Sequence, residues 1–359
     1  MLCFSTTVQE DSAAFRSQLL AELGNRCPLQ SDAMCRVIRG MMGGDWREEQ
    51  IVEFLTALRK KGETGQEIAD AASVLREHMV RFDCGTHEVL DTCGTGGDGA
   101  GTFNISTAAA LVAAGAGVTV VKHGNRAASG RTGSADVLTA LGVSVDSDLS
   151  WTKRCLEHAG FAFCFAPRFH PAMRHVAAAR RRLGFRTLFN CLGPLSNPAG
   201  ACYQLIGVGH LDWLDPLADA VRRLGTRRTL LVFGSDGIDE VSLAAPTYVR
   251  EVQNGQVASW QWTAEDFDLA TCSLNELRSE GPKESSERIQ AILNGEEGPA
   301  TRVVLANASA ALIAAGKAET PADGVMMARE AINTGKAHAV LKRLIACSPI
   351  ETPVQASGK

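Results

Sequence analysis

The sequence DTCGTGGDGAGTFNIST, residues 91–107, decides the fold. It overlaps the end of a β-type run at 89–93 and leads into an Ala-rich segment that starts at Ala108. Five of the eight residues from Gly94 to Gly101 are glycine, which lets backbone N–H groups come close to an anion. Ser106 and Thr107 lie where a helix N-terminus would add the positive end of its dipole. The stretch predicts a strand, a loop that binds phosphate or pyrophosphate, and a helix.

This loop also fits the glycine pattern of dinucleotide-binding proteins, through Gly94, Gly96 and Gly99. Such proteins carry an acidic residue about 20 positions further on, at the end of the next strand, to hold ribose hydroxyls. Here the next strand ends in the basic pair Lys122-His123. A carboxylate inside the loop would also repel phosphate unless a cation intervened. The sequence therefore disfavours a dinucleotide site, and a tight strand–helix turn without a ligand is the other alternative.

A second loop, KHGNRAASGRTGSAD at residues 122–136, closes the next expected strand. Lys122, Arg126 and Arg131 supply positive charge, while glycines and small hydroxyl residues allow a ligand to approach. A helix is expected from Ser134 to Gly142. Parallel strands present their carboxyl ends at one sheet edge, so both loops should face the same ligand. The alternative is a solvated basic turn.

Two further segments carry charge. The sequence GSDGIDE, residues 234–240, follows the apolar run 230–233, and its carboxylates suit Mg²⁺, which takes one or two carboxylates with phosphate oxygens and water. The segment from His170 to Gly184 is helical and very basic. If it folds over the ligand edge of the sheet, one of its arginines could pair with a substrate carboxylate, although the sequence does not choose which. An acidic surface turn and a solvated helix face are the respective alternatives.

The periodicity of the chain changes once. Residues 11–81 show apolar residues at helical spacing, as in Ile51, Phe54, Leu55 and Leu58. From His87 onward, β-type runs alternate with helical stretches, which predicts a mostly parallel sheet with flanking helices. These runs are 89–93, 118–121, 161–165, 205–208, 230–233 and 303–305. The fold class is α/β, with a small helical part before the larger α/β part.

Composition excludes several classes of protein. The chain has 359 residues, a formal net charge of −4, 45% hydrophobic and 21% charged residues, which is typical of a globular chain of about two domains. No apolar run is long enough for a membrane helix, and the N-terminus does not resemble a secretory signal. The weakly acidic charge does not favour nucleic-acid binding. Its 11 cysteines contain no C-x-x-C pair, which favours reduced thiols in the cytoplasm.

Several co-linear motifs together resemble the anthranilate phosphoribosyltransferase family over about Met34 to Leu344. They are GTGGDG at 94–99, TFNIST at 102–107, KHGNR at 122–126, GSAD at 133–136, HPAM at 170–173, NCLGPL at 190–195, NPA at 197–199, DGIDE at 236–240 and Asn307-Ala308. The resemblance implies a helical domain at 1–85, completed by a helical insertion near 167–188. An α/β domain of nucleoside phosphorylase type is then expected at 86–166 and 189–359. A homodimer formed through the helical domain is also implied.

The reaction implied is transfer of the phosphoribosyl group of phosphoribosyl pyrophosphate to the amino group of anthranilate, an early step of tryptophan biosynthesis. Charge that develops on the leaving pyrophosphate would be stabilised by Mg²⁺ and backbone N–H groups. The amine of anthranilate is already a nucleophile, so no acid or base is assigned and positioning carries the catalysis.

The resemblance also implies a role for individual residues. The phosphoribosyl pyrophosphate site would comprise Gly94, Gly97, Asp98, Thr102, Asn104, Ile105, Ser106, Thr107, Lys122, His123, Gly124, Asn125, Arg126, Ala127, Ala128, Ser129, Gly130 and Ser134. Anthranilate would contact Gly94, Asn125 and Arg180, with Arg180 facing its carboxylate. The ligands of Mg²⁺ would be Ser106, Asp239 and Glu240.

The chain departs from the family pattern at two positions. Gly130 stands where the family usually has a second serine after Ser129, and Thr132 replaces the serine that usually begins the next motif. Weaker substrate binding is the expected effect of the missing hydroxyl at Gly130. The alternatives are a relative that uses another aromatic amine, a nucleic-acid-binding protein of the same fold and a nucleoside phosphorylase. The intact Asn125 and Arg180 argue against another aromatic amine. The net negative charge argues against nucleic-acid binding, and the TFNIST motif argues against a nucleoside phosphorylase.

Overall fold

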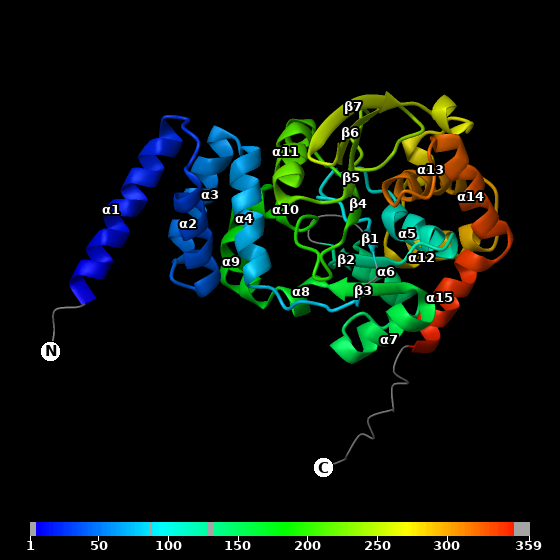
Figure 1. The fold of residues 1–359 in the computed structure, drawn as a ribbon, viewed down its shortest axis with the longest axis horizontal. Coiled ribbons are helices and arrows are strands. Elements are labelled where there is room, and N and C mark those ends of the chain that lie inside the picture. The colour runs from blue at the N-terminus through cyan, green and yellow to red at the C-terminus, as the bar shows by residue number, and fades with distance from the viewer. Residues whose placement is uncertain (1–4, 86–87, 128–131, 348–359) are drawn as a thin grey trace, which may run out of the picture.

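A computed structural model describes residues 5–85, 88–127 and 132–347, with only the backbone for residues 5–12. The chain begins with helices that stand at one end of the molecule (Figure 1). They are α1 (Ser5–Gly24), α2 (Ser31–Gly43), α3 (Glu48–Lys61) and α4 (Gly65–Glu77). The helix α4 begins at a capping box in which the Thr64 hydroxyl accepts from Glu67 N and the Glu67 carboxylate accepts from Thr64 N. No described helix combines the length and the apolar character that a membrane span requires.

The described part of the chain forms one sheet of seven strands in the order β3-β2-β1-β4-β5-β6-β7. The strands are β1 (Leu90–Asp91), β2 (Val120–Gly124), β3 (Phe161–Phe165), β4 (Tyr203–Gly207), β5 (Arg228–Gly234), β6 (Thr247–Gln253) and β7 (Gln256–Trp262). Pairing is parallel from β3 to β5 and antiparallel from β5 to β7. Leu90 of β1 pairs with Val120 on one side and with Tyr203 on the other. The winding therefore reverses between β1 and β4, the switch point at which open α/β sheets bind ligands.

Helices cover both faces of the sheet. One face, with Val120, Leu205 and Val232, packs into a large core with the buried helices α5 and α13. The other face, with Ile206 and Leu231, packs against α11 and the N-terminal helices. The remaining helices of the α/β part are α5 (Ile105–Gly115), α6 (Ser134–Ala140), α7 (Leu149–Ala159), α11 (Leu214–Leu224), α12 (Pro282–Leu293), α13 (Pro299–Ala314), α14 (Pro321–Asn333) and α15 (Lys336–Cys347).

A later segment returns to the N-terminal helices. It consists of α8 (Ala166–Phe169), α9 (Arg174–Leu183) and α10 (Leu188–Leu192), and α9 lies beside α2 and α3. Val176 and Ala179 of α9 are buried in the same core as Val37 and Phe54. An insertion near 167–188 that completes the helical domain would make contacts of this kind. The boundaries of the two domains stay a prediction.

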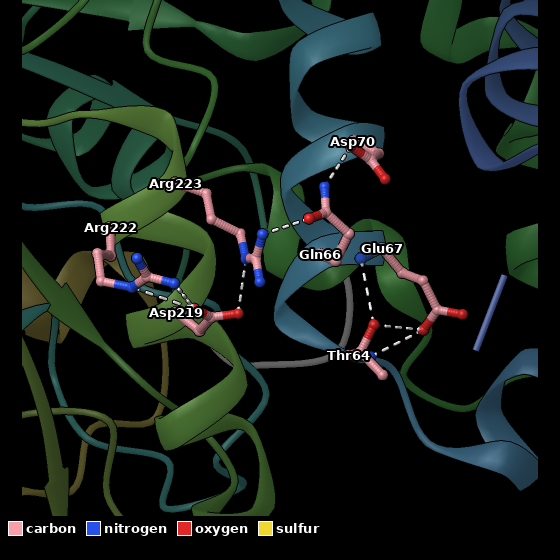
Figure 2. Close-up of polar contacts among 7 residues, drawn as sticks. All are labelled: Thr64, Gln66, Glu67, Asp70, Asp219, Arg222 and Arg223. Atoms are coloured by element: carbon pink, nitrogen blue, oxygen red, sulfur yellow. Dashed lines mark hydrogen bonds and ion pairs between the residues drawn. The ribbon is translucent and has the colours of Figure 1, made fainter. Parts of the chain in front are cut away.

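The N-terminal helices and the α/β part meet closely where α4 lies against α11 (Figure 2). Arg223 of α11 donates to the Asp219 carboxylate over 2.8 Å and also to the Gln66 side chain of α4. A Cβ on Gly65 would lie 2.4 Å from Asp219 Oδ2 and 2.6 Å from its Cβ, so a side chain at this position would force the two helices apart. The first turn of α4 is thereby fixed against α11, which covers one face of the sheet.

The secondary structure differs from the expectation in three places: one expected strand is a helix, one hairpin was not expected, and one helix begins earlier. The run 303–305 is part of helix α13, and a short apolar run in a helix that is buried on all sides cannot be told from a strand by periodicity. The hairpin of β6 and β7 was missed, although its turn, Asn254-Gly255, with φ of 51° and 73°, is a strong hairpin signal. Helix α1 also begins at Ser5, before the expected helical block.

Candidate active site

A cavity of about 630 Å³ opens at the switch point of the sheet. All four charged or glycine-rich segments of the sequence contribute to its lining. Of the expected site residues, the lining includes Gly94, Gly97, Asp98, Thr102, Asn104, Ile105, Ser106, Lys122, His123, Gly124, Asn125, Arg126, Ala127, Ser134, Arg180, Asp239 and Glu240. Thr107 is buried behind the cavity wall. Ala128, Ser129 and Gly130 lie outside the described residues.

The glycine loop is held against the end of β4 by two hydrogen bonds of Thr95, one from its backbone and one to its side chain. Thr95 N donates to Gly207 O and Gly209 N donates to Thr95 Oγ1, each over 2.8 Å. A Cβ on Gly94 would lie 3.0 Å from Gly207 O, and a Cβ on Gly207 would lie 1.7 Å from Asp239 O. Glycine is therefore needed at Gly207 because the loop and the acidic turn both approach the strand end there.

The helix after the loop begins slightly earlier than expected. Asn104 is the N-cap of α5, and its side-chain oxygen accepts from Thr107 N over 3.0 Å. The Ser106 hydroxyl donates to the same oxygen over 3.4 Å. The positive end of this helix dipole thus lies at the cavity, in agreement with an anion site.

Lys122 is buried, with 1% of its surface exposed, so the alternative of a solvated basic turn is wrong for this residue. Its ammonium donates to Thr92 O (2.8 Å), Thr92 Oγ1 (3.0 Å) and Ser106 Oγ (3.2 Å). Burial lowers the pKa of Lys122, and the Asp91 carboxylate opposes this shift. The side chain joins the end of β1 to the start of α5 and places a cation beside the glycine loop.

Three carboxylates meet at the acidic turn. Burial, and next the charge of Asp98, raises the pKa of Asp239 to about 7. Burial and the charge of Asp239 raise the pKa of Glu240, while Lys122 and the N–H of Ser106 oppose this. Asp236 has a structural role, since its carboxylate accepts from Ser242 Oγ over 2.6 Å. Carboxylates that repel one another beside a hydroxyl form a set of oxygen ligands that fits a divalent cation.

Two histidines, His123 and His170, form a neutral wall of the cavity. His123 was among the expected site residues and His170 was not. Their ring centroids are 4.9 Å apart, and His123 Nδ1 lies 2.9 Å from Gly193 O. Burial lowers the pKa of His123 to about 3 and that of His170 to about 4. Both rings are therefore uncharged at neutral pH. The signal for His170 was its place in the HPAM motif.

Arg180 extends from α9 into the cavity from the side of the N-terminal helices. Its guanidinium lies 5.7 Å from the centroid of the Phe189 ring, and burial lowers its pKa. It makes no hydrogen bond or ion pair with another described residue. A half-buried cation without an anionic neighbour in a ligand cavity is suited to a ligand carboxylate.

Other residues that shape the site carry no recognisable motif. Gly207, Gly209 and Arg186 hold the glycine loop from segments that are distant in the chain. Their approach to the loop depends on the order of the strands, which the sequence did not reveal.

The fold and the cavity define a class of protein, a transferase with a helical bundle and an α/β domain. Matches to two family models agree: "Glycosyl transferase family, helical bundle domain" covers residues 17–79, and "Glycosyl transferase family, a/b domain" covers residues 86–338. Among curated relatives, the anthranilate phosphoribosyltransferase of Symbiobacterium thermophilum is 48% identical over 85% of this chain and 89% of the relative. That of Thioalkalivibrio sulfidiphilus is 45% identical over 91% and 97%. The chain belongs to the anthranilate phosphoribosyltransferase family.

Solved structures of the family superimpose closely. The anthranilate phosphoribosyltransferase of Thermus thermophilus matches with a TM-score of 0.86 and 42% identity, over 92% of this chain and 98% of its own. The enzyme of Saccharomyces cerevisiae in complex with PRPP and Mg matches with a TM-score of 0.83 and 28% identity over the same shares. The same yeast enzyme with 4-fluoroanthranilate matches with a TM-score of 0.82 and 27% identity, again over 92% and 98%.

Proposed function

We propose that this chain transfers the phosphoribosyl group of phosphoribosyl pyrophosphate to the amino nitrogen of anthranilate in tryptophan biosynthesis. The products are N-(5-phosphoribosyl)anthranilate and pyrophosphate. One observation carries the proposal: a single cavity joins a glycine loop and three carboxylates to the unpaired cation of Arg180. The glycine loop and the carboxylates suit a phosphorylated sugar with its metal, and Arg180 suits an aromatic carboxylate. Membership of the family supports both assignments.

The donor substrate is assigned to the sheet edge. Backbone N–H groups of the glycine loop and the N-terminus of α5 stabilise negative charge that grows on pyrophosphate as the bond to the sugar breaks. Lys122 adds positive charge behind the loop. The opposite wall comprises Gly124, Asn125, Arg126, Ala127 and Ser134, together with Ala128, Ser129 and Gly130, which are assigned by the motif alone.

Magnesium is assigned to Ser106, Asp239 and Glu240, with Asp98 nearby. The observation that supports the fit is the gathering of three carboxylates. Burial and the neighbouring carboxylate charges raise the pKa of Asp239 and Glu240, and a divalent cation would relieve that repulsion. When bound, the ion would neutralise charge on the pyrophosphate oxygens. A relative bound to PRPP and Mg is in line with this assignment.

Anthranilate is assigned to Arg180, Gly94 and Asn125, all of which line the cavity. Pairing of the carboxylate with Arg180 fixes one end of the molecule, so that its amine can be oriented toward the sugar. The amine attacks with its own lone pair, and the two low-pKa histidines do not supply a charged group at neutral pH. Catalysis then rests on orientation and on charge stabilisation.

The resemblance further supports a homodimer formed through α1–α4 and a location in the cytoplasm. Light scattering coupled to size-exclusion chromatography tests the first. A mass of one chain at micromolar concentration would contradict it.

The proposed activity is tested by the fluorescence of anthranilate, which is lost on conversion to the product. Purified protein is mixed with phosphoribosyl pyrophosphate, anthranilate and Mg²⁺, and parallel samples omit the sugar donor or contain a chelator. A decrease is expected only in the complete mixture. Constant fluorescence with folded protein and excess Mg²⁺ would refute the proposal.

A further inference from the structure

The glycine loop has little conformational preference of its own. Gly96, Gly97, Gly99 and Gly101 all have φ between 67° and 77°, in the left-handed region. Glycine loses more conformational freedom on ordering than any other residue, so a loop with these residues is loose unless other contacts hold it. A loop that presents N–H groups to pyrophosphate must keep those groups convergent before the ligand arrives.

Two of the contacts that hold the loop come from the end of β4 and converge on Thr95. They fix the beginning of the loop, through Thr95 N to Gly207 O and Gly209 N to Thr95 Oγ1. The next residues, Gly96 and Gly97, have no side chain with which to anchor themselves. The backbone of Gly96 hydrogen-bonds to the Asp239 carboxylate, so the contact still required is one that fixes Gly97.

Arg186 makes that contact. Its Nη1 donates to Gly209 O, and its Nε lies so close to the loop that a Cβ on Gly97 would be 2.9 Å away. The Nη1 atom, which donates to Gly209 O, would also lie 3.3 Å from a Cβ on Gly209. One planar group therefore packs against the loop backbone and is fixed to the strand end. Arg186 does not line the cavity, so it acts through the loop and does not touch the ligand.

Arg186 also lies at a particular place in the chain. Helix α9, which carries Arg180, ends at Gly184 with φ of 64°, and α10 begins at Leu188 with Thr187 as its N-cap. The segment between the two helices thus connects the assigned anthranilate side of the cavity to its pyrophosphate side. A side chain on this segment that packs against Gly97 links the two sides physically.

We propose that Arg186 is a positioning residue that holds the glycine loop in its anion-binding shape and thereby determines the affinity for phosphoribosyl pyrophosphate. This inference rests on the proposed function. It requires the planar fork of arginine, because a donor to Gly209 O and a flat surface over Gly97 are needed together. A lysine would supply the charge without the fork.

The test compares Arg186→Met and Arg186→Lys with the control Arg181→Met, which removes an exposed arginine of α9. Two measurements are made: hydrogen exchange of the peptide that spans residues 94–101 in the free protein, and the KM of each substrate with kcat. Both Arg186 variants should show faster exchange of this peptide. The KM for phosphoribosyl pyrophosphate should rise by about tenfold or more, a change equivalent to the loss of one good contact. The KM for anthranilate should change by less than that for the sugar donor, and the control should match the wild type.

Normal exchange and an unchanged KM in Arg186→Met would overturn the proposal. Full restoration by lysine would also overturn it, because charge alone would then suffice. If Arg186→Met does not fold, as judged by circular dichroism, Arg186→Lys carries the test with the same measurements. Absence of transferase activity in the wild type would refute the proposed function, whereas exchange in the free protein would still decide the role of Arg186.

Discussion

Replacement of Arg180 by methionine should weaken binding of anthranilate without weakening the fold. The guanidinium is half-buried, its pKa is lowered by burial, and it has no ion pair or hydrogen bond with a described residue. Methionine keeps most of the apolar stem that packs near Phe189 while it removes the charge. Because no partner is left unpaired, the free energy of unfolding should stay the same or rise.

The expected loss of binding follows from the interaction removed. A charge-assisted hydrogen bond to a carboxylate contributes about 1.5–3 kcal/mol. At about 1.36 kcal/mol per factor of ten, this corresponds to a fall in kcat/KM for anthranilate of roughly 10- to 150-fold. The KM for phosphoribosyl pyrophosphate should change little, since Arg180 lies on the other side of the cavity.

The assay is steady-state kinetics from anthranilate fluorescence, with each substrate varied in turn, together with urea unfolding of each protein. Arg181→Met, with the same change of charge at an exposed neighbour, is the control. Equal losses for both substrates would refute the assigned role of Arg180. A large drop in the free energy of unfolding would show that Arg180 has a structural partner and would also contradict the reasoning.

Three further changes test other parts of the site. Joint replacement Asp239→Asn and Glu240→Gln should raise the Mg²⁺ concentration for half-maximal activity by about tenfold or more. An unchanged titration would show that these two carboxylates do not bind the metal. Gly207→Ala places a Cβ 1.7 Å from Asp239 O, so it should lower the free energy of unfolding by about 1–3 kcal/mol and remove most of the activity. The control Gly24→Ala, whose Cβ would have nothing within 4 Å, should lower it by less than about 0.5 kcal/mol. Since the pKa of His170 is lowered to about 4, the native state binds fewer protons than the unfolded state between about pH 4 and 6.5, and stability falls as the pH falls through this window. Between about pH 7.5 and 5, the free energy of unfolding measured with urea should therefore fall by about 2 kcal/mol less in His170→Phe than in the wild type. An equal fall in both proteins would contradict a buried, neutral His170.

The glycine loop could be predicted because its determinants are local. A strand, glycines that permit positive φ and a capping residue before an Ala-rich helix lie within 17 consecutive residues, 91–107. The helix cap lies two or three residues earlier than expected, because Asn104, not Ser106 or Thr107, is the cap. The alternation of strands and helices likewise followed from short-range patterns. The prediction failed at 303–305, where a short apolar run belongs to a helix that is buried on all sides.

The assembly of the site could not be predicted from local patterns. Asp98 meets Asp239 only because β1 and β5 end at the same edge of the sheet. Gly207 and Arg186 act on the loop through tertiary contacts that leave no periodic signal. The neutral state of the two histidines depends on burial, which the sequence does not reveal. Several of these residues lie in recognisable motifs, but their chemistry depends on the tertiary structure that brings them together.

Identification of the products of a complete reaction is the sharpest test of the proposed transfer. Protein, phosphoribosyl pyrophosphate, anthranilate and Mg²⁺ are incubated, and anthranilate, its phosphoribosyl derivative and pyrophosphate are quantified by mass spectrometry and a pyrophosphate assay. We expect the phosphoribosyl derivative and pyrophosphate to appear in equal amounts as anthranilate disappears. Release of pyrophosphate without the derivative, or no reaction with folded protein, would contradict the proposed transfer.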